Sequence, residues 1–440
     1  MPAPIPLKML YAGLACALLS GPASAAEPYP DAIASDPARL GWMVGSPPPP
    51  ERQVRFDDGS YFRFPQLRWS VSNFRQLMPT MNISRGLDAP APLERALRTD
   101  IDALTFLPLG SEQPMTWADS LLANYTDGIL VLHKGRVVYE RYFGVLTPAG
   151  QHGAMSITKT FTGTLAALLV AEGTLDPQRK VADYVPELAR SAFGDATVRQ
   201  VMDMTTGIRF SEDYADPNAE VWAHAAAGNP LPKPEGYQGP RSYYEFLQTV
   251  RPEGRHGEAF HYRTVNADMA GWLVARASGK SVAELASQRL WRPMGAEQSA
   301  YMLVDGIGTP YAGGGLSAGL RDLGRLGLLM LNDGVINGRR LFPAEVVRHL
   351  RGGGDPAKFG TAYPALVGGS YTSLWWVYPG RHEVIAARGV HGQTIYVDFS
   401  TRMVLVRLAS FPKASNPLID PTSIPAFQVL ADYLQDNAPA

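Results

Sequence analysis

The sequence of 440 residues contains one cysteine, Cys16, so the chain cannot form an internal disulfide. Cys16 also lies in an N-terminal segment that we expect to be removed from the mature protein. Thiol catalysis is therefore excluded together with disulfide stabilisation. The folded chain must be stabilised by its core alone, and 45% hydrophobic residues fit a folded globular protein.

The sequence also lacks an excess of charge of either sign, with 40 basic and 41 acidic residues. Nucleic acids and anionic membranes attract proteins with a basic excess, so neither is expected as the main partner. The eight histidines show no metal-binding spacing such as H-E-x-x-H. We therefore expect no metal and no cofactor, and the partner is expected to be a small-molecule substrate.

Long hydrophobic runs are absent except for a short one near the start, where M-L-Y-A-G-L-A-C-A-L-L follows Lys8. Small residues ending in A-S-A at Ala25 come next, which is the pattern of a secretory signal peptide over residues 1–26. Gly13 stands where a lipoprotein signal normally has leucine, so lipid attachment is not expected. The pattern predicts a periplasmic or secreted protein with no membrane attachment once the signal is removed.

Residues 27–120 are rich in proline and aromatic residues, and their hydrophobic residues rarely recur with the spacing of a helix or a strand. We interpret this part as an extended segment packed on the main body, because a disordered linker rarely carries so many large apolar side chains.

The remaining residues, 121–440, predict one domain with strands at both ends and helices between them. A hairpin over 128–142 turns at K-G, and further strands are expected near 383–390, 394–399 and 403–410. The expected helices cover 157–173, 196–204, 265–278, a stretch from about 320, and 424–436. We expect an α/β fold of the α+β type, with an antiparallel sheet from both chain ends and an inserted helical lobe at about 175–310.

Two serine motifs resemble catalytic patterns but lack their structural setting. G-L-S-A-G at 315–319 matches the nucleophile elbow, yet we expect a loop before Ser317 and interpret Ser317 as a helix N-cap. S-F-P-K at 410–413 places a proline between serine and lysine, so the two cannot share a helical turn. Neither serine is expected to be a nucleophile.

The stretch G-A-M-S-I-T-K-T-F-T-G at 153–163 has a better setting. Positions three apart lie on one helix face, so Ser156 would present its hydroxyl beside Lys159. The alternative is a capping serine with a solvated lysine. The helix after Lys159 is almost entirely apolar or small, however, and a buried lysine without a role is costly, which favours a catalytic pair.

Several stretches resemble the serine β-lactamase and penicillin-binding-protein superfamily, in the same order along the chain. They are M-S-I-T-K at 155–159, V-M-D-M-T-T-G-I at 201–208, H-Y-R-T-V-N at 261–266, G-G-G-L-S-A-G-L-R-D-L at 313–323 and G-V-H-G-Q at 389–393. The stretches L-G-W-M-V-G-S-P-P-P-P-E-R and S-E-D-Y-A-D-P are similar to the branch of 6-aminohexanoate-dimer hydrolases, the nylon-oligomer amidases, and related esterases.

This resemblance implies a role for each matching residue. Ser156 would be the acylated nucleophile and Lys159 its partner, with Tyr262 as a base whose pKa the ammonium lowers. The backbone N–H groups of Ser156 and Val390 would form the oxyanion hole. A buried tyrosine that only makes a hydrogen bond is the alternative for Tyr262.

The resemblance also implies substrate-binding residues. Tyr214 matches a loop tyrosine that covers the substrate, and His391 and Gly392 lie in the stretch that replaces the superfamily's K-T-G. The side chains of Trp375 and Trp376 alternate across a strand, and we expect Trp376 to face the cleft. An ordinary hydrogen bond is the alternative for His391.

The departures from the superfamily pattern concern the substrate. S-D-N and K-T-G are both absent, Thr264 replaces an asparagine found in many relatives, and without the K-T-G lysine a β-lactam is not the expected substrate. We expect a secreted serine hydrolase that cleaves linear amides or esters through an acyl-enzyme. The alternatives are a carboxylesterase, a peptidase acting on D-amino-acid or cell-wall fragments, and an acylated sensor that does not turn over. The oligomeric state stays open.

Overall fold

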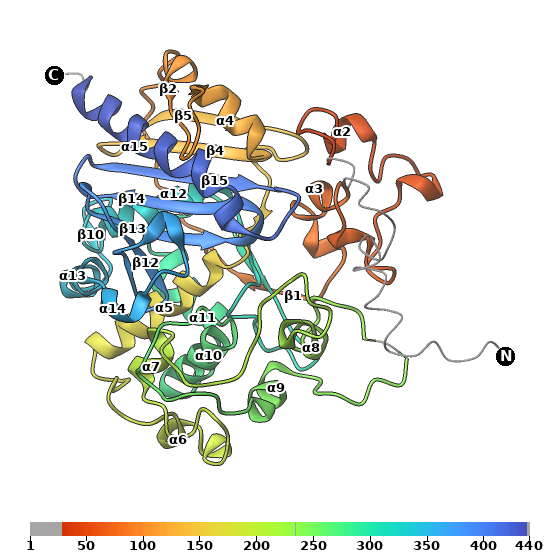
Figure 1. Cartoon of the computed structure of the whole chain (residues 1–440), viewed down its shortest axis with the longest axis vertical. Helices are drawn as coiled ribbons and strands as arrows, with labels where there is room; N and C mark the ends of the chain where they lie inside the picture. Colours follow the sequence, from red (N-terminus) through yellow and green to blue (C-terminus); the bar gives the residue numbers. More distant parts are fainter. Residues whose placement is uncertain (1–28, 234, 438–440) are drawn as a thin grey trace.

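The computed structural model describes residues 29–233 and 235–437 (Figure 1), so the signal peptide expected at 1–26 lies outside the described residues. A seven-stranded antiparallel sheet forms the centre, in the order β11-β12-β13-β14-β15-β4-β5. Its strands are β4 (Thr126–His133), β5 (Arg136–Tyr142), β11 (Ser370–Thr372), β12 (Trp375–Tyr378), β13 (Val384–Gly389), β14 (Gln393–Asp398) and β15 (Met403–Ala409).

The strands from the two chain ends meet next to the β5 edge of this sheet, where β15 pairs with β4 and Leu405 lies opposite Val131. The hairpin β4–β5 turns at Lys134–Gly135, where both residues have positive φ. The expected α+β fold, with an antiparallel sheet built from both ends of the chain, is therefore confirmed.

Helices cover both faces of the sheet (Figure 1). α12 (Leu320–Leu331) and α5 (Ile157–Ala171) pack on one face, and α4 (Trp117–Ala123) and α15 (Asp420–Asp436) pack on the other. The remaining helices are α2 (Pro37–Leu40), α3 (Leu67–Ser70), α6 (Val181–Tyr184), α7 (Val198–Met202), α8 (Glu220–Ala227), α9 (Tyr243–Thr249), α10 (Val265–Ser278), α11 (Val282–Ala286), α13 (Ala344–Gly352) and α14 (Pro356–Phe359).

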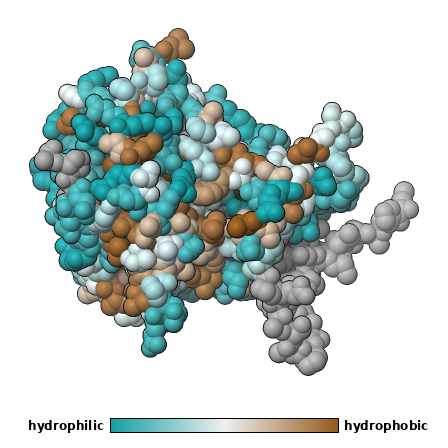
Figure 2. All heavy atoms as spheres, turned by 90° about the horizontal axis from the view of Figure 1, so that it is seen from above, coloured by the Kyte–Doolittle hydropathy of each residue, from teal (hydrophilic) through white to brown (hydrophobic). Residues whose placement is uncertain are grey.

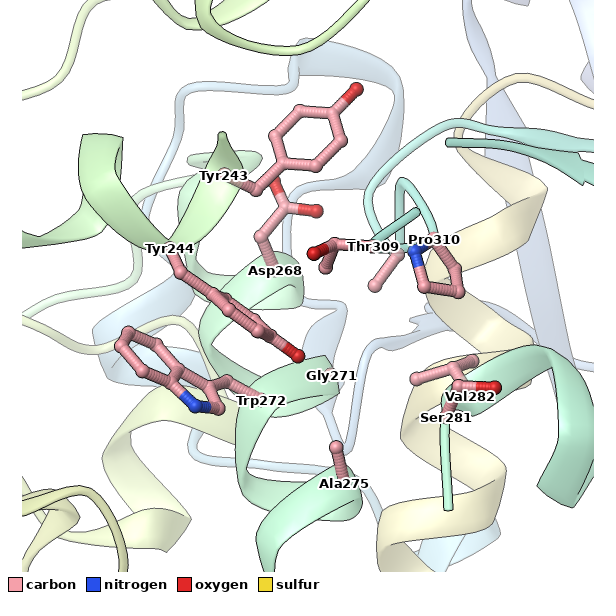
Figure 3. Close-up of a pocket in the computed structure, with 11 residues that line it drawn as sticks. Tyr243, Tyr244, Asp268, Gly271, Trp272, Ala275, Ser281, Val282, Thr309 and Pro310 are labelled. Atoms are coloured by element: carbon pink, nitrogen blue, oxygen red, sulfur yellow. The ribbon is translucent and has the colours of Figure 1, made fainter. Parts of the chain in front are cut away.

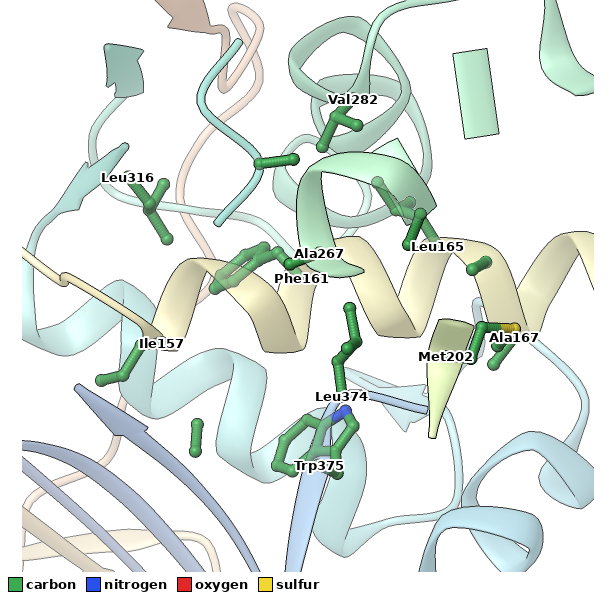
Figure 4. Close-up of a cluster of buried hydrophobic side chains, with 14 of the residues drawn as sticks. Ile157, Phe161, Leu165, Ala167, Met202, Ala267, Val282, Leu316, Leu374 and Trp375 are labelled. Carbon is green, nitrogen blue, oxygen red and sulfur yellow. The ribbon is translucent and has the colours of Figure 1, made fainter. Parts of the chain in front are cut away.

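α5 lies at the centre of the largest hydrophobic cluster, and side chains from several elements surround it (Figure 4). Ile157, Phe161 and Leu165 on α5 are all buried. Trp375 packs beneath them and donates a hydrogen bond from Nε1 to Thr164 Oγ1 at 3.1 Å. The helix that begins at the catalytic candidate Ser156 is thus held rigidly by the core of the protein.

A second, four-stranded sheet was not expected from the sequence. It has the order β1-β7-β8-β6, with β1 (Thr80–Ile83), β6 (His152–Gly153), β7 (Ala300–Leu303) and β8 (Leu316–Ala318), and the small pairs β2 (Thr105–Phe106) with β3 (Met115–Thr116) and β9 (Val335–Ile336) with β10 (Arg339–Arg340) complete the strands. Because β6 precedes α5 directly, this sheet fixes the chain that leads into Ser156.

The interpretation of Ser317 as a helix N-cap is wrong. Ser317 lies in β8, where it pairs with Gly153 and Tyr301, and Gly319 is the N-cap of α12. A three-residue strand is too short to show a period of its own, and only pairing with two distant segments creates it. Ser317 is completely buried. In the other serine motif, the serine and the lysine lie in different environments, since Ser410 is buried while Lys413 is exposed.

The N-terminal segment packs on the body through a small hydrophobic cluster. Tyr61, Trp69 and Phe74 from this segment belong to the same cluster as Met155, which directly precedes Ser156. β1 extends the same attachment by pairing with β7. The face seen from above in Figure 2 carries hydrophilic residues over much of its area, with hydrophobic residues between them. Among the residues that the structure describes, no helix is long and apolar enough to cross a membrane.

Candidate active site

Ser156 and Lys159 lie at the first turn of α5, as the spacing predicts. Lys159 Nζ donates to Ser156 Oγ at 2.8 Å and to the Gly313 carbonyl at 2.7 Å, and the Lys159 side chain is 1% exposed. Thr158 stabilises the start of the helix by donating to the Met155 carbonyl at 2.6 Å. A serine hydroxyl and a buried amine are thus in direct hydrogen-bond contact, which is the geometry that general-base activation requires.

Tyr262 completes the group from the segment that leads into α10. Ser156 lies near enough to its hydroxyl to lower the pKa of Tyr262, and Lys159 Nζ lies 5.0 Å from the centre of its ring. The Trp376 ring stacks on Tyr262 with centroids 5.4 Å apart. Strand alternation therefore places Trp376 beside Tyr262, while Trp375 lies in the core.

Burial lowers the pKa of Lys159 to about 8, although the charges of Glu212 and Asp268 act in the opposite direction. Burial raises the pKa of Tyr262 well above its usual range, and the charge of Glu212 raises it further. The pKa of Tyr262 is therefore raised, whereas the resemblance implied that the neighbouring ammonium lowers it. Desolvation disfavours the phenolate of Tyr262 and the ammonium of Lys159 alike, so burial shifts both side chains toward their neutral forms.

The end of β13 passes directly over the residues that precede Ser156. A Cβ at position 389 would lie 2.8 Å from the Ala154 carbonyl oxygen and 3.0 Å from Met155 Cβ, so only glycine allows this approach. Val390 follows Gly389 and packs in the cluster that contains Met155. The N–H groups of Ser156 and Val390, both named from the sequence, thus belong to neighbouring segments at the start of α5.

His391 is buried, and its backbone has a left-handed conformation, with φ of 63°, instead of the extended conformation of a strand. Its Nδ1 lies 2.7 Å from the Phe411 carbonyl, which can only accept, so Nδ1 carries the proton. Burial lowers the pKa of His391 to about 4, and its Nε2 has no hydrogen-bond partner among the described residues. Gly392 follows with φ of 99° and is buried.

Tyr214 lies in the segment before α8, half-buried, with its ring edge-on to Trp222 at 5.8 Å. The same segment carries Glu212, a site residue that sequence reasoning missed although it stands in the quoted S-E-D-Y. Its Oε1 accepts a hydrogen bond from the Thr264 N–H at the start of α10. The carboxylate also acts electrostatically on Lys159 and Tyr262.

A small pocket lies behind these groups, between α10, the start of α11 and the Thr309–Ala312 segment (Figure 3). Asp268 is part of its wall, but Ser156 and Lys159 are not. We place the active site by the hydrogen-bonded groups and not by this pocket. Within residues 29–233 and 235–437, no group of three or more His, Cys, Asp or Glu side chains is arranged to hold a metal ion.

Comparisons with known proteins identify the family of the chain. Residues 118–423 match the family model described as Beta-lactamase. The chain is 34% identical over 389 residues to the 6-aminohexanoate-dimer hydrolase of Paenarthrobacter ureafaciens, covering 87% of this chain and 91% of that protein.

Solved structures are similar to this chain in fold. The fold matches a structure from Bacillus anthracis that carries the name 6-aminohexanoate-dimer hydrolase, with a TM-score of 0.78 and 28% identity over 86% of this chain and 97% of that one. A D-stereospecific amidohydrolase from Streptomyces shares the fold, with a TM-score of 0.51 and 18% identity over 73% of this chain and 97% of that one. Because the family model covers well over half of the sequence, the chain belongs to the beta-lactamase family.

Proposed function

We propose that this protein is a serine hydrolase that cleaves linear amides or esters through an acyl-enzyme, similar in activity to 6-aminohexanoate-dimer hydrolases. The relative that is 34% identical over most of both chains carries that name. The observation that carries the proposal is the 2.8 Å contact between Ser156 Oγ and the buried Lys159 amine, whose pKa burial lowers to about 8.

The proposed reaction begins when the neutral Lys159 amine accepts the Ser156 proton and Oγ attacks the substrate carbonyl carbon. The N–H groups of Ser156 and Val390 stabilise the oxyanion. Tyr262, which is held as a phenol by burial, gives its proton to the leaving amine or alcohol and recovers one from the Lys159 ammonium. Water then releases the acid from Ser156 by the reverse proton path.

Tyr214, Trp376, His391 and Gly392 are proposed to bind the substrate. Trp376 supports this role through its stacking on Tyr262, and His391 through its free Nε2 acceptor. Export to the periplasm or the medium is proposed on the pattern of residues 1–26 alone.

The test compares hydrolysis of a short-chain p-nitrophenyl ester and of the 6-aminohexanoate linear dimer by wild type, Ser156→Ala and Ser317→Ala. We expect Ser156→Ala to lose at least about 10⁴-fold in kcat, as removal of a serine nucleophile does elsewhere. Ser317→Ala is expected to retain activity because Ser317 is buried in β8.

The ratio of amide to ester turnover separates an amidase from a carboxylesterase. A trapped acyl group on Ser156 by mass spectrometry, without product release, would instead indicate the sensor. A fully active Ser156→Ala protein, or a folded but inactive Ser317→Ala protein, would overturn the proposal.

A further inference from the structure

A buried histidine–carboxylate pair lies beside Lys159 and has no role in the proposed reaction. His224 Nε2 and Asp268 Oδ2 are 2.8 Å apart, and the two side chains are 1% and 2% exposed. An ionised carboxylate only accepts hydrogen bonds, so Nε2 of His224 donates. The pair joins α8 of the helical lobe to α10, and Figure 3 shows Asp268 beside Tyr243 and Thr309.

The peptide of Gly313 connects this pair to the catalytic lysine. Its N–H donates to Asp268 Oδ1 at 3.0 Å, and its carbonyl accepts from Lys159 Nζ at 2.7 Å. A Cβ at position 313 would lie 2.4 Å from Thr264 Cγ2 and 3.3 Å from Asp268 Oδ2. Glycine is therefore required for the peptide to lie between the carboxylate and the amine.

Two threonines of α5 hold the same loop on its other side. Thr162 Oγ1 donates to the Ala312 carbonyl at 3.1 Å, and Thr158 Oγ1 accepts from the Leu316 N–H at 2.9 Å. The loop is thus held between α5 and α10, and Asp268 is its side-chain acceptor on α10. The orientation of the Gly313 carbonyl depends on this carboxylate.

Resting on the proposed function, we propose that Asp268 and His224 are positioning residues of the reaction. They fix the Gly313 carbonyl that holds Lys159 Nζ against Ser156, and they place a buried negative charge beside the amine. When Lys159 is neutral, its hydrogen bond to Gly313 turns the nitrogen lone pair toward the Ser156 hydroxyl. The pair thereby sets both the direction of the Lys159 lone pair and the basicity of its amine.

The charged and titratable groups around Lys159 fix the sign of the electrostatic effect. Glu212 and Asp268 favour the ammonium, whereas burial disfavours it, and Tyr262 faces the amine as a neutral phenol. His224 is faced by Tyr243 and Tyr311, whose pKa values burial raises, so neither ionises near neutral pH. Removing the charge of Asp268 therefore lowers the pKa of Lys159.

The test uses Asp268→Asn, which removes the charge and keeps an acceptor for the Gly313 N–H. The second acceptor becomes an N–H donor, so His224 must change tautomer to keep its hydrogen bond to residue 268. The readout is the pH dependence of Ser156 phosphorylation by diethyl p-nitrophenyl phosphate, together with that of kcat/KM on a p-nitrophenyl ester. In wild type, both rates are expected to rise with pH through about 8, as Lys159 loses its proton. In Asp268→Asn the midpoint of this rise is expected to lie about half a pH unit or more below that of wild type.

His224 is tested by a pair of variants. His224→Leu removes the donor to Asp268 and is expected to lower kcat by about tenfold, because the carboxylate and Gly313 lose a fixed position. His224→Gln supplies an N–H donor again and is expected to restore most of the rate. If Asp268→Asn does not fold, these two variants still test whether the His224–Asp268 pair positions Lys159.

A matched control is available in another His–Asp pair outside the candidate site, His382 and Asp398, which are 2.6 Å apart and 10% and 0% exposed. Asp398→Asn is expected to lower stability and leave the pH profile unchanged. An unchanged or upward-shifted profile in Asp268→Asn, or an equal shift in Asp398→Asn, would overturn the inference. An active Ser156→Ala protein would instead reject the proposed function, so the two failures are distinguishable.

Discussion

Lys159 is a buried amine whose burial costs stability. Its side chain is 1% exposed, and burial lowers its pKa from 10.5 to about 8. In the unfolded chain the amine stays protonated up to its ordinary pKa. Folding at neutral pH must therefore desolvate an ammonium or remove its proton, and either process opposes the folded state.

We predict that Lys159→Met is inactive but at least as stable as wild type at pH 7, with an advantage on the order of 3 kcal/mol less the lost hydrogen bonds. Between pH 8 and 10.5 the unfolded chain binds more protons than the folded one, so wild-type stability rises with pH. The advantage of Lys159→Met is accordingly largest below pH 8 and disappears above 10.5. Denaturant unfolding at several pH values measures it.

The control is the exposed Lys413, where Lys413→Met should change stability little at any of these pH values. If Lys159→Met were less stable than wild type at pH 7, by more than its two hydrogen bonds account for, burial would not be the source of the pKa shift.

At the scale of elements, α5 must approach the turn between β11 and β12 closely. Gly163 makes this possible, since a Cβ there would lie 2.0 Å from the Ser373 carbonyl oxygen and 2.7 Å from Leu374 Cβ. Both neighbours belong to a turn with positive φ, so the backbone cannot easily yield. The close packing of α5 keeps the Ser156–Lys159 turn in place.

We predict that Gly163→Ala destabilises the protein by about 2 kcal/mol or more, because a well-packed interior does not accept an added methyl group. Gly352→Ala, at the exposed end of α13 with no atom within 4 Å of the added Cβ, is the control and should stay within about 1 kcal/mol of wild type. Thermal unfolding of both variants tests this. A Gly163→Ala protein as stable as Gly352→Ala would show that α5 can shift.

At the scale of the whole molecule, the N-terminal segment is attached by a buried arginine as well as by its hydrophobic cluster. Arg68 donates to Asp127 at 3.2 Å and to Ser410 at 3.1 Å, and both partners are buried. It also donates to the Ala32 carbonyl and to Ser35 at 3.0 Å. One guanidinium thus joins the segment to the first and last strands of the central domain.

We predict that Arg68→Ala destabilises the protein by about 3–5 kcal/mol, since it leaves the Asp127 charge buried and loses one of its partners. Arg55→Ala removes the exposed pair with Asp57 and should leave stability nearly unchanged, because water and salt screen such a pair. Melting temperatures and kcat/KM of both variants test this. Equal effects of the two substitutions would mean that the segment is not attached through Arg68.

The local sequence was sufficient for much of this protein. Alternating β-branched residues around K-G predicted the hairpin β4–β5, and the apolar run after Lys159 predicted α5. The three-residue spacing placed Lys159 Nζ beside Ser156 Oγ, because helical geometry alone brings those positions together. Such features depend on neighbours within one or two turns, so a single sequence contains them.

Only the tertiary structure decided the strand at Ser317, the site position of Glu212 and the protonation of Tyr262. A short strand exists only through its partners, and the pKa of a side chain is set by the burial and charge that distant segments supply. Asp268 contacts the Lys159 site through Gly313, 45 residues further along the chain. The sequence by itself determined which groups form the candidate site, and the packing of distant segments decided their burial and the direction of their pKa shifts.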